Sequence, residues 1–240
     1  KMQVKIITRH SPANYGSLLQ SIATQKLVEQ IGYSNEIYNI KNMKKYGVLL
    51  LITEVEGELS FVFQVRNREI RQGGEISLPG GRYELEDENT RNTAIRETIE
   101  EMGISEEDIE IIGKLDSIIS HGNIFVDSYV GYTSKHPDEF KINKSEVESI
   151  FTIPIDYFIE NRPVMHEIAY YASPYMHNPT TDEKIILLPA KELGLPEKYS
   201  KMWNQHNISI PFYKTEKGLI WGLTAQIVMF YCNTIDGITK

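Results

Sequence analysis

Apolar positions along this chain recur with two periods, one typical of strands and one typical of helices. Two apolar runs, residues 48–53 and 59–65, flank the polar turn Glu56-Gly57-Glu58 and predict a β-hairpin. Similar segments predict further strands at residues 109–115, 125–132 and 147–154, the last leading into a short helix near residues 157–158. Strands and helices mix without strict alternation, which predicts an α/β fold with a mixed sheet between helices.

A helix is predicted immediately before Gly103. Ile95, Ile99 and Met102 recur at the spacing of one helical face, so they are expected to form the side of the helix that faces the core. Gly103 follows directly and suits the end of a helix, because glycine readily adopts the left-handed conformation found there. The sequence thus predicts an amphipathic helix whose other faces are polar.

Three carboxylates crowd together on this helix. Glu97, Glu100 and Glu101 stand at positions i, i+3 and i+4, which share one face. Like charges at this spacing destabilise an isolated helix by roughly 0.2–0.5 kcal/mol per pair, and a divalent cation would remove that repulsion. Clustered hard oxygen ligands favour Mg²⁺ or Mn²⁺ over zinc. The alternative interpretation is a solvated acidic face without a metal.

The two ends of the chain give weaker signals. Residues 4–8 and 36–40 predict strands on either side of a helix at residues 17–30. This amino-terminal segment, residues 1–42, has no clear role and is too short to build a core alone, so we expect it to pack on something else, and residues 43–240 are expected to form the main domain. Within that domain, prolines interrupt residues 161–218, which predicts irregular structure, and residues 219–226 predict a closing helix with Trp221 on its core face.

Composition and charge narrow the class of protein. Of the 240 residues, 41% are hydrophobic and 10% aromatic, as in a folded protein with a sizeable core. The formal net charge is −8 and the basic residues are scattered, which argues against a nucleic-acid partner. No apolar run approaches the ~18 residues of a membrane span, and no signal-peptide pattern is found, so no membrane partner is expected. Cys232 is the single cysteine, and we expect a cytoplasmic protein. The oligomeric state stays open.

The residues around the helix resemble a known signature. The turn Leu78-Pro79-Gly80-Gly81 precedes the helix, and the motif comprises Gly81, Asp87, Arg96, Glu97, Glu100, Glu101 and Gly103. This set resembles the Nudix box, the loop-helix-loop of the Nudix hydrolases. Eight residues separate Asp87 from Arg96, one more than in the generic box, and this insertion is similar to the coenzyme A pyrophosphatase branch. The arginine-rich stretch from Arg66 to the glycine turn is also similar to that branch, although Leu78 stands where the branch has a phenylalanine.

The resemblance implies a fold and a set of roles. The fold would be a Nudix-type α/β/α sandwich with a mixed β-sheet and a catalytic loop-helix-loop. Glu97, Glu100 and Glu101 would hold Mg²⁺ or Mn²⁺, and Glu100, Glu101, Glu146 and Arg96 would form the catalytic set, with Arg96 orienting a carboxylate. Glu146, ahead of residues 147–154, is the expected general base, and His121 is the alternative. Substrate binding would fall to Arg66, Arg71, Gly80 and Gly81, because arginines suit phosphates and glycines allow close approach.

The implied activity is cleavage of a diphosphate bond in a small nucleotide substrate. Coenzyme A or acyl-coenzyme A would give 3′,5′-ADP and 4′-phosphopantetheine or its acyl derivative. One alternative keeps the fold and changes the substrate to another nucleoside diphosphate derivative, such as ADP-ribose or NADH. A second alternative is a non-catalytic Nudix-like binding module. Residues 1–42 weakly resemble the start of polysaccharide pyruvyl transferases through Asn14-Tyr15-Gly16, but they are too few for a complete active site.

Overall fold

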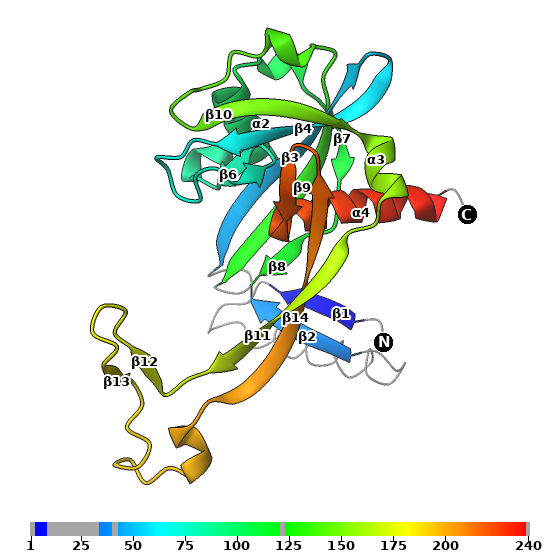
Figure 1. The fold of residues 1–240 in the computed structure, drawn as a ribbon. Coiled ribbons are helices and arrows are strands. Elements are labelled where there is room, and N and C mark those ends of the chain that lie inside the picture. Colours follow the sequence, from blue (N-terminus) through cyan, green and yellow to red (C-terminus); the bar gives the residue numbers. More distant parts are fainter. Residues whose placement is uncertain (1–2, 9–33, 40–42, 121–122, 239–240) are drawn as a thin grey trace. The chain divides into compact units, whose positions relative to one another are not determined.

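The computed structural model describes residues 3–8, 34–39, 43–120 and 123–238 (Figure 1). The chain divides into two compact units, one formed by residues 1–159 with 230–240 and the other by residues 160–229. In the described residues, no helix is long and apolar enough to cross a membrane. The predicted boundary between residues 1–42 and 43–240 differs from this division and stays a prediction.

The first unit is built on a mixed sheet. Its strand order is β10 (Val147–Pro154), β4 (Glu58–Arg66), β3 (Lys44–Val55), β9 (Ile124–Tyr132) and β7 (Glu110–Lys114). Three short strands extend it: β5 (Ile76–Ser77), β6 (Gly80–Arg82) and β8 (Ile118–Ser120) pair with β4, β3 and β9. Strands β3 and β9 run parallel, whereas the other pairs are antiparallel. The predicted strands at residues 109–115, 125–132 and 147–154 are thereby confirmed to within a residue.

The β3–β4 hairpin confirms the turn predicted from the sequence. Its loop residues Glu56 and Gly57 both have positive φ, at 53° and 85°. Two-residue hairpin loops favour positive φ at both positions because their twist matches that of the flanking strands. The turn sets Ile52 opposite Phe61, so the buried side chains of both strands fall in register.

Helix α2 (Thr90–Met102) covers one face of this sheet. The side chain of Asn89 caps its start by accepting the backbone N–H groups of Arg91 and Asn92. Gly103 ends it in the left-handed conformation, with φ of 65°, as predicted. The buried face of the helix includes Ala94 and Met102, which pack in one cluster with Leu49 and Leu51 of β3, Val62, Ile104, Tyr129 and Phe140.

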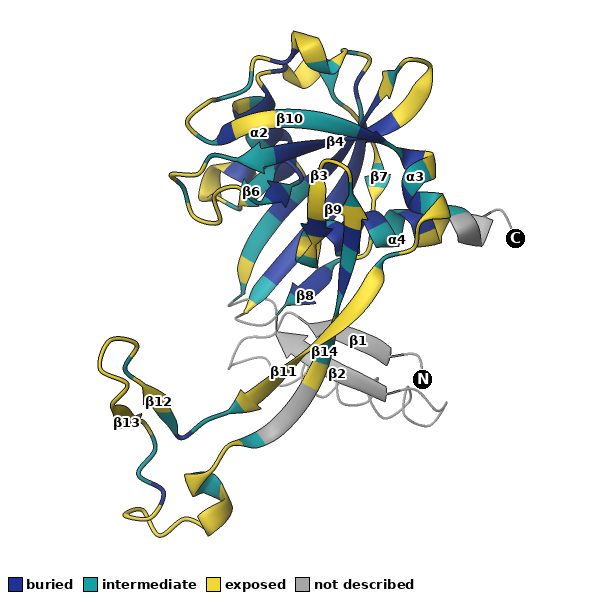
Figure 2. Ribbon diagram, in the orientation of Figure 1, coloured by how far each residue is buried: buried dark blue, intermediate teal, exposed yellow. Residues whose placement is uncertain are grey.

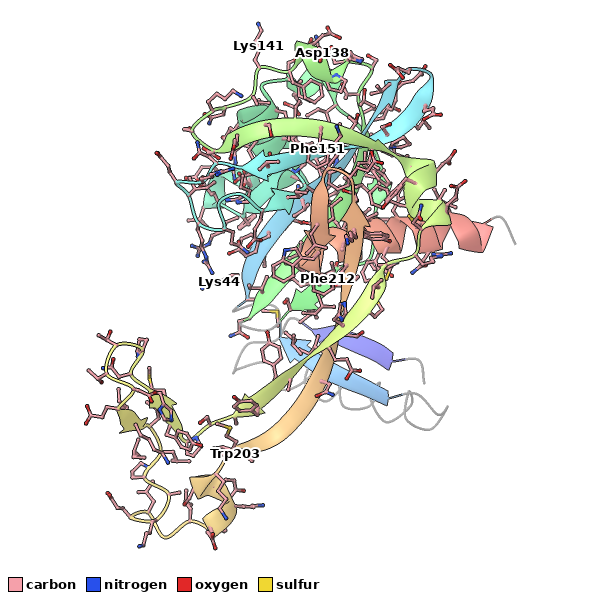
Figure 3. The ribbon with its side chains drawn as sticks, viewed as in Figure 1. Lys44, Asp138, Lys141, Phe151, Trp203 and Phe212 are labelled. Carbon is pink, nitrogen blue, oxygen red and sulfur yellow. The ribbon has the colours of Figure 1, made fainter. Side chains whose placement is uncertain are left out.

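The opposite face of the sheet is aromatic. Phe61 of β4 contacts Phe158 of α3 (Ile155–Glu160) and Tyr231 of α4 (Gly222–Ile238), with ring centroids 5.6 and 5.0 Å apart. Phe63 stacks on Phe151 of β10 at 5.7 Å (Figure 3). The central strands are accordingly the most buried part of this unit (Figure 2). A mixed sheet between α2 on one side and α3 and α4 on the other is the predicted α/β/α sandwich.

The second unit corrects two predictions. Residues 161–218 are not irregular: they form β11 (Val164–Ala172), β14 (Trp203–Thr215) and the hairpin of β12 (Tyr175–His177) with β13 (Lys184–Ile186), and Gly218 begins β15 (Gly218–Trp221). Strand β14 pairs with β11 on one side and β15 on the other. The closing helix starts at Gly222 and not at residue 219, so Trp221 lies on a strand, where it stacks on Phe212 and is 39% exposed.

Short elements complete the described chain. Four 3-10 turns occur at η2 (Leu85–Asp87), η3 (Glu106–Asp108), η4 (Pro137–Glu139) and η5 (Glu197–Ser200). Near the amino terminus, β1 (Gln3–Thr8) and β2 (Ser34–Asn39) pair in parallel, which matches the strands predicted there. The predicted helix at residues 17–30 and the Asn14-Tyr15-Gly16 motif lie outside the described residues.

Candidate active site on helix α2

Arg96 and Asp87 form the best-defined ion pair of the site. Arg96 Nε lies 2.7 Å from Asp87 Oδ1 and Arg96 Nη2 lies 3.0 Å from Oδ2, a bidentate pair. Asp87 also accepts the Thr93 hydroxyl at 2.9 Å and the Glu84 N–H at 2.9 Å. The hydrogen bond from Arg96 is the main cause that lowers the pKa of Asp87 to about 2. The pair thus fixes the loop before α2 to the helix.

The same guanidinium reaches two of the predicted metal ligands. Arg96 lies 3.0 Å from a carboxylate oxygen of Glu97 and 3.2 Å from one of Glu100. This arrangement agrees with the expected role of Arg96 in orienting carboxylates. The three glutamates differ in exposure, because the side chain of Glu100 is 50% exposed, that of Glu97 is 16% exposed, and Glu101 is buried.

Glu101 is held inside the protein by the glycine turn and the sheet. Its Oε2 accepts the N–H of Gly80 at 3.0 Å. Burial raises the pKa of Glu101 to about 7, although hydrogen bonds from Gln64 and Gly80 act in the opposite direction. Burial likewise raises the pKa of Glu97. The nearby charges of Glu100 and Glu146 raise this pKa further, whereas Arg96 lowers it. The face therefore contains carboxylates whose negative charge is costly in the absence of a cation.

Two adjacent glycines shape the turn against this face. A β-carbon on Gly81 would overlap the carboxylate of Glu97, so only glycine leaves room for that group. Gly80 has φ of 146°, and a β-carbon there would lie 2.7 Å from the Cα of Val48. The predicted importance of both glycines therefore has a geometric basis, in which Gly81 accommodates a side chain and Gly80 packs against strand β3.

Glu146, the predicted general base, immediately precedes β10. Its effect on the pKa of Glu97 shows that the two carboxylates are near each other. The Glu146 side chain accepts Asn143 Nδ2 at 3.3 Å, and the backbone N–H of Asn143 donates to the carbonyl of Glu101 at 3.0 Å. Asn143 therefore connects Glu146 to the end of α2. The alternative base, His121, lies outside the described residues.

The arginine loop joins the site from strand β4. Arg66 lies at the end of β4 and lowers the pKa of Glu101 through its charge, and its Nε donates to the backbone carbonyl of Arg71 at 3.3 Å. Arg71 is exposed, and no described contact connects its side chain to the glutamates. The loop also docks on the Glu146 segment, because Asn67 donates its N–H to the carbonyl of Glu146 at 2.8 Å and its Nδ2 to that of Lys144 at 2.7 Å.

Several supporting residues were missed in the sequence analysis. A β-carbon on Gly47 would overlap the backbone of α2 at Thr90, so this glycine lets the helix approach β3. An isolated glycine within an apolar strand is a known sign of such an approach. Gln64 is fully buried, its Nε2 donates to Ser77 Oγ at 3.2 Å, and its Oε1 has no described partner. A glutamine within the apolar run at residues 59–65 was the available signal.

The start of α2 is also fixed to the sheet. Thr90, its first residue, donates its hydroxyl to Asp127 Oδ2 of β9 at 2.6 Å. The other carboxylate oxygen of Asp127, Oδ1, lies 2.6 Å from the ammonium group of Lys114 and accepts a hydrogen bond from the Ser117 hydroxyl at 2.5 Å. Burial acts to raise the pKa of Asp127, but these hydrogen bonds outweigh it and the pKa is lowered. The helix that bears the glutamates is thus fixed at its first turn as well as at its end.

The donor chemistry of the site fits a hard divalent cation. All candidate ligands are carboxylate oxygens, the type that Mg²⁺ and Mn²⁺ prefer. In the described residues, no three acidic, histidine or cysteine side chains converge as a finished metal centre. Glu97 and Glu100 instead pair with Arg96, and Glu101 pairs with Gly80. A hollow of about 330 Å³ flanks the helix beside Arg96 and Glu100, but Glu97, Glu101 and Glu146 do not line it.

Several known proteins and one family model are similar to this chain. A model of the NUDIX domain family matches residues 43–174. Nudix hydrolase 3 of Caenorhabditis elegans is 39% identical over 117 residues, which are 47% of this chain and 48% of that protein. The peroxisomal coenzyme A diphosphatase ndx-8 of the same organism is 37% identical over 119 residues, 48% of this chain and 50% of that protein.

A mammalian relative and a solved structure are similar over about half of this chain. The peroxisomal coenzyme A diphosphatase NUDT7 of Mus musculus is 30% identical over 135 residues, 56% of this chain and 54% of that protein. The chain therefore spans about half the length of the curated relatives that it matches. The Nudix hydrolase RenU of M. Smegmatis superimposes with a TM-score of 0.42 and 17% identity, covering 49% of this chain and 74% of that one. Because the family match covers more than half of the sequence, this chain belongs to the NUDIX domain family.

Proposed function

We propose that this chain is a metal-dependent Nudix pyrophosphohydrolase that cleaves the diphosphate bond of coenzyme A or acyl-coenzyme A. The products would be 3′,5′-ADP and 4′-phosphopantetheine or its acyl derivative. The observation that best supports a catalytic site is the seating of the helix against the glycine turn, where Gly81 leaves room for Glu97 and Gly80 anchors Glu101. Similarity to two proteins named coenzyme A diphosphatases supports the substrate.

Each side chain has a defined task in this proposal. Glu97, Glu100 and Glu101 would hold Mg²⁺ or Mn²⁺, and Arg96 keeps Glu97 and Glu100 oriented toward one another. The bound cation would neutralise the diphosphate oxygens. Glu146 would accept a proton from the attacking water, with its carboxylate positioned by Asn143.

The arginine loop would bind the phosphates of the substrate. Arg66 lies near enough to Glu101 for its charge to lower the pKa of that carboxyl, which sets it beside the proposed cation site. Arg71 lies on an exposed loop, and Arg66 donates a hydrogen bond to its backbone carbonyl. The guanidinium of Arg71 is therefore available to a ligand phosphate. The loop also contacts the Glu146 segment through Asn67, which keeps the phosphate-binding and water-activating segments in a fixed relation.

A substrate screen tests the proposal. The purified chain would be incubated with Mg²⁺ or Mn²⁺ and with coenzyme A, acetyl-coenzyme A, ADP-ribose or NADH, and the products separated by chromatography and identified by mass. We expect 3′,5′-ADP and 4′-phosphopantetheine from coenzyme A. Faster cleavage of ADP-ribose or NADH would favour the alternative substrate class. Binding without hydrolysis of any compound, with either metal, would favour the non-catalytic binding module.

A further inference from the structure

Exposed hydrophobic side chains concentrate in one unit of this protein. Among the described residues, fifteen of the eighteen exposed large hydrophobic residues fall within residues 160–229. Single exposed hydrophobic residues are ordinary, but such a concentration indicates an interaction surface.

Five of these fifteen residues lie on β11, which pairs with β14 in a two-stranded ribbon. Val164, Met165, Ile168 and Tyr171 of β11 are between 41% and 60% exposed, and residues 164–171 of the strand are all exposed, on both faces of the ribbon (Figure 2). A two-stranded ribbon is only marginally stable in water when neither face is covered. Strands of another polypeptide, paired to its edge, would extend it to the three or more strands that an independently stable sheet needs.

The outer edge of β11 indicates how that polypeptide would bind. Among the described strands, β11 pairs with β14 alone, so one edge of this nine-residue strand is available for pairing. It contains no lysine and no proline, the residues that commonly prevent edge-to-edge association, and Glu167 is its one charged residue. The neighbouring strand β14 contains Pro211, which makes its own edge a poorer template.

Charge favours a second copy of this chain as the partner. Residues 160–229 contain seven basic and seven acidic residues, so this unit is formally neutral and the net charge of −8 belongs to the rest of the chain. Two copies can therefore approach through this unit without net repulsion, whereas a nucleic acid would require a basic excess. A lipid bilayer is also a poor partner, because open sheet edges do not occur in hydrocarbon.

We propose that this protein forms a two-fold symmetric homodimer in which β11 pairs antiparallel with β11 of a second copy, about an axis near Ile168. An antiparallel pair of identical strands is isologous, so one surface serves both subunits and the assembly closes at two. The pairing would join two β11–β14 ribbons into a continuous sheet, in which apolar side chains of the two β11 strands pack against each other across the axis.

Sedimentation velocity of the whole chain over a range of concentrations tests this dimer. We expect a dimer for the unmodified protein, and Ile168→Lys should weaken self-association at least about 100-fold, since it sets like charges against each other across the axis. The matched control is Ile112→Lys, at a 61% exposed isoleucine on the edge strand β7 of the other unit. A monomeric unmodified protein, a dimer that survives Ile168→Lys, or a dimer broken by Ile112→Lys instead would each overturn the proposal.

Cysteine cross-linking locates the interface without relying on a disruptive variant. The native Cys232 is buried, so a short bis-maleimide should react with an introduced surface cysteine in preference to it. Ile168→Cys should give a covalent dimer in high yield, and Ile112→Cys should remain a monomer under the same conditions. Equal yields from the two variants, or cross-linking only at position 112, would reject β11 as the interface.

Discussion

Gly81 faces the carboxylate of Glu97 with no side chain between them, and a β-carbon at Gly81 would overlap that carboxylate. The group that would be displaced is the flexible end of a side chain and not backbone. Gly81→Ala should therefore cost less than ~1 kcal/mol of unfolding free energy, while moving Glu97 out of the proposed cation site. We expect turnover to fall by roughly 10²-fold at limiting Mg²⁺, measured by metal titration of the hydrolysis rate.

The neighbouring Gly80 provides the contrast to that prediction. Gly80 has a φ of 146° and lies close to the backbone of β3. The β-carbon of Gly80→Ala would therefore clash with backbone atoms, which cannot move as a flexible side chain can. Gly80→Ala should lower the thermal midpoint clearly, and Gly81→Ala should not. Full activity of Gly81→Ala at limiting Mg²⁺ would show that the position of Glu97 beside Gly81 is not needed for turnover.

Glu101 should control both activity and the pH dependence of stability. Glu101→Gln should reduce turnover by about 10²–10³-fold, because it removes a charged ligand from the proposed cation site. In metal-free protein, the native pKa of about 7 exceeds the ordinary value of 4.5, so stability should fall as pH rises from 4.5 through 7. That loss should approach ~3 kcal/mol and be absent in Glu101→Gln, as measured by urea unfolding at several pH values. Identical pH profiles for the two proteins would contradict the buried state of Glu101.

The Asp87–Arg96 pair should contribute stability that is lost in strong acid. Because the native pKa of Asp87 is about 2, below the ordinary 3.8, the pair stabilises the fold above pH 3.8 and this contribution is lost as pH falls through 2. Asp87→Asn should lower the free energy of unfolding at pH 7 by about 2 kcal/mol. The exposed Glu86, in the same turn, supplies the control, and Glu86→Gln should change stability by less than ~0.5 kcal/mol.

The general base can be assigned by comparing two variants. Glu146→Gln should lower kcat about 10²–10⁴-fold while leaving the apparent affinity for Mg²⁺ nearly unchanged, because Glu146 is proposed to act on water and not to hold the cation. Asn143→Ala should produce a smaller loss of kcat, since it keeps the carboxylate and removes its hydrogen bond from Asn143 together with the turn contacts of Asn143 to Ser145. A large decrease of kcat in His121→Ala, together with normal kcat in Glu146→Gln, would identify His121 as the general base.

The elements that were predictable from the sequence are those governed by local rules. The hairpin followed from Gly57 and its apolar flanks, and the end of α2 followed from Gly103. The β11–β14 ribbon was missed because Pro211 and the prolines between the two strands suggested irregular structure, and because the strands pair across a long insertion. Long-range pairing of this kind leaves no periodic signal in either strand alone.

The candidate site likewise has features that local sequence predicts and features that depend on tertiary packing. The glutamates lie within one helix, so their shared face followed from helical spacing. Their unequal burial did not, because it depends on the glycine turn and on Gln64 of a distant strand. The link from Asn143 to Glu101 is likewise tertiary, since the two residues are 42 positions apart in the sequence, whereas Asn143 and Glu146 are only three positions apart.

Arg71 provides the test of substrate identity. Arg66 holds the backbone of Arg71 in an exposed loop beside the proposed cation site, and the arginine-rich approach to the glycine turn motivates a contact with the 3′-phosphate of coenzyme A. One charge-assisted hydrogen bond is worth about 1.5–3 kcal/mol, so coenzyme A should exceed 3′-dephospho-coenzyme A roughly ten- to a hundred-fold in kcat/KM. Arg71→Ala should remove most of that preference and spare cleavage of the dephospho form, whereas Arg68→Ala, whose guanidinium pairs with Glu148, serves as the control and should preserve it. Equal kcat/KM values for the two substrates in the unmodified protein would leave a broader nucleoside diphosphate hydrolase as the better description.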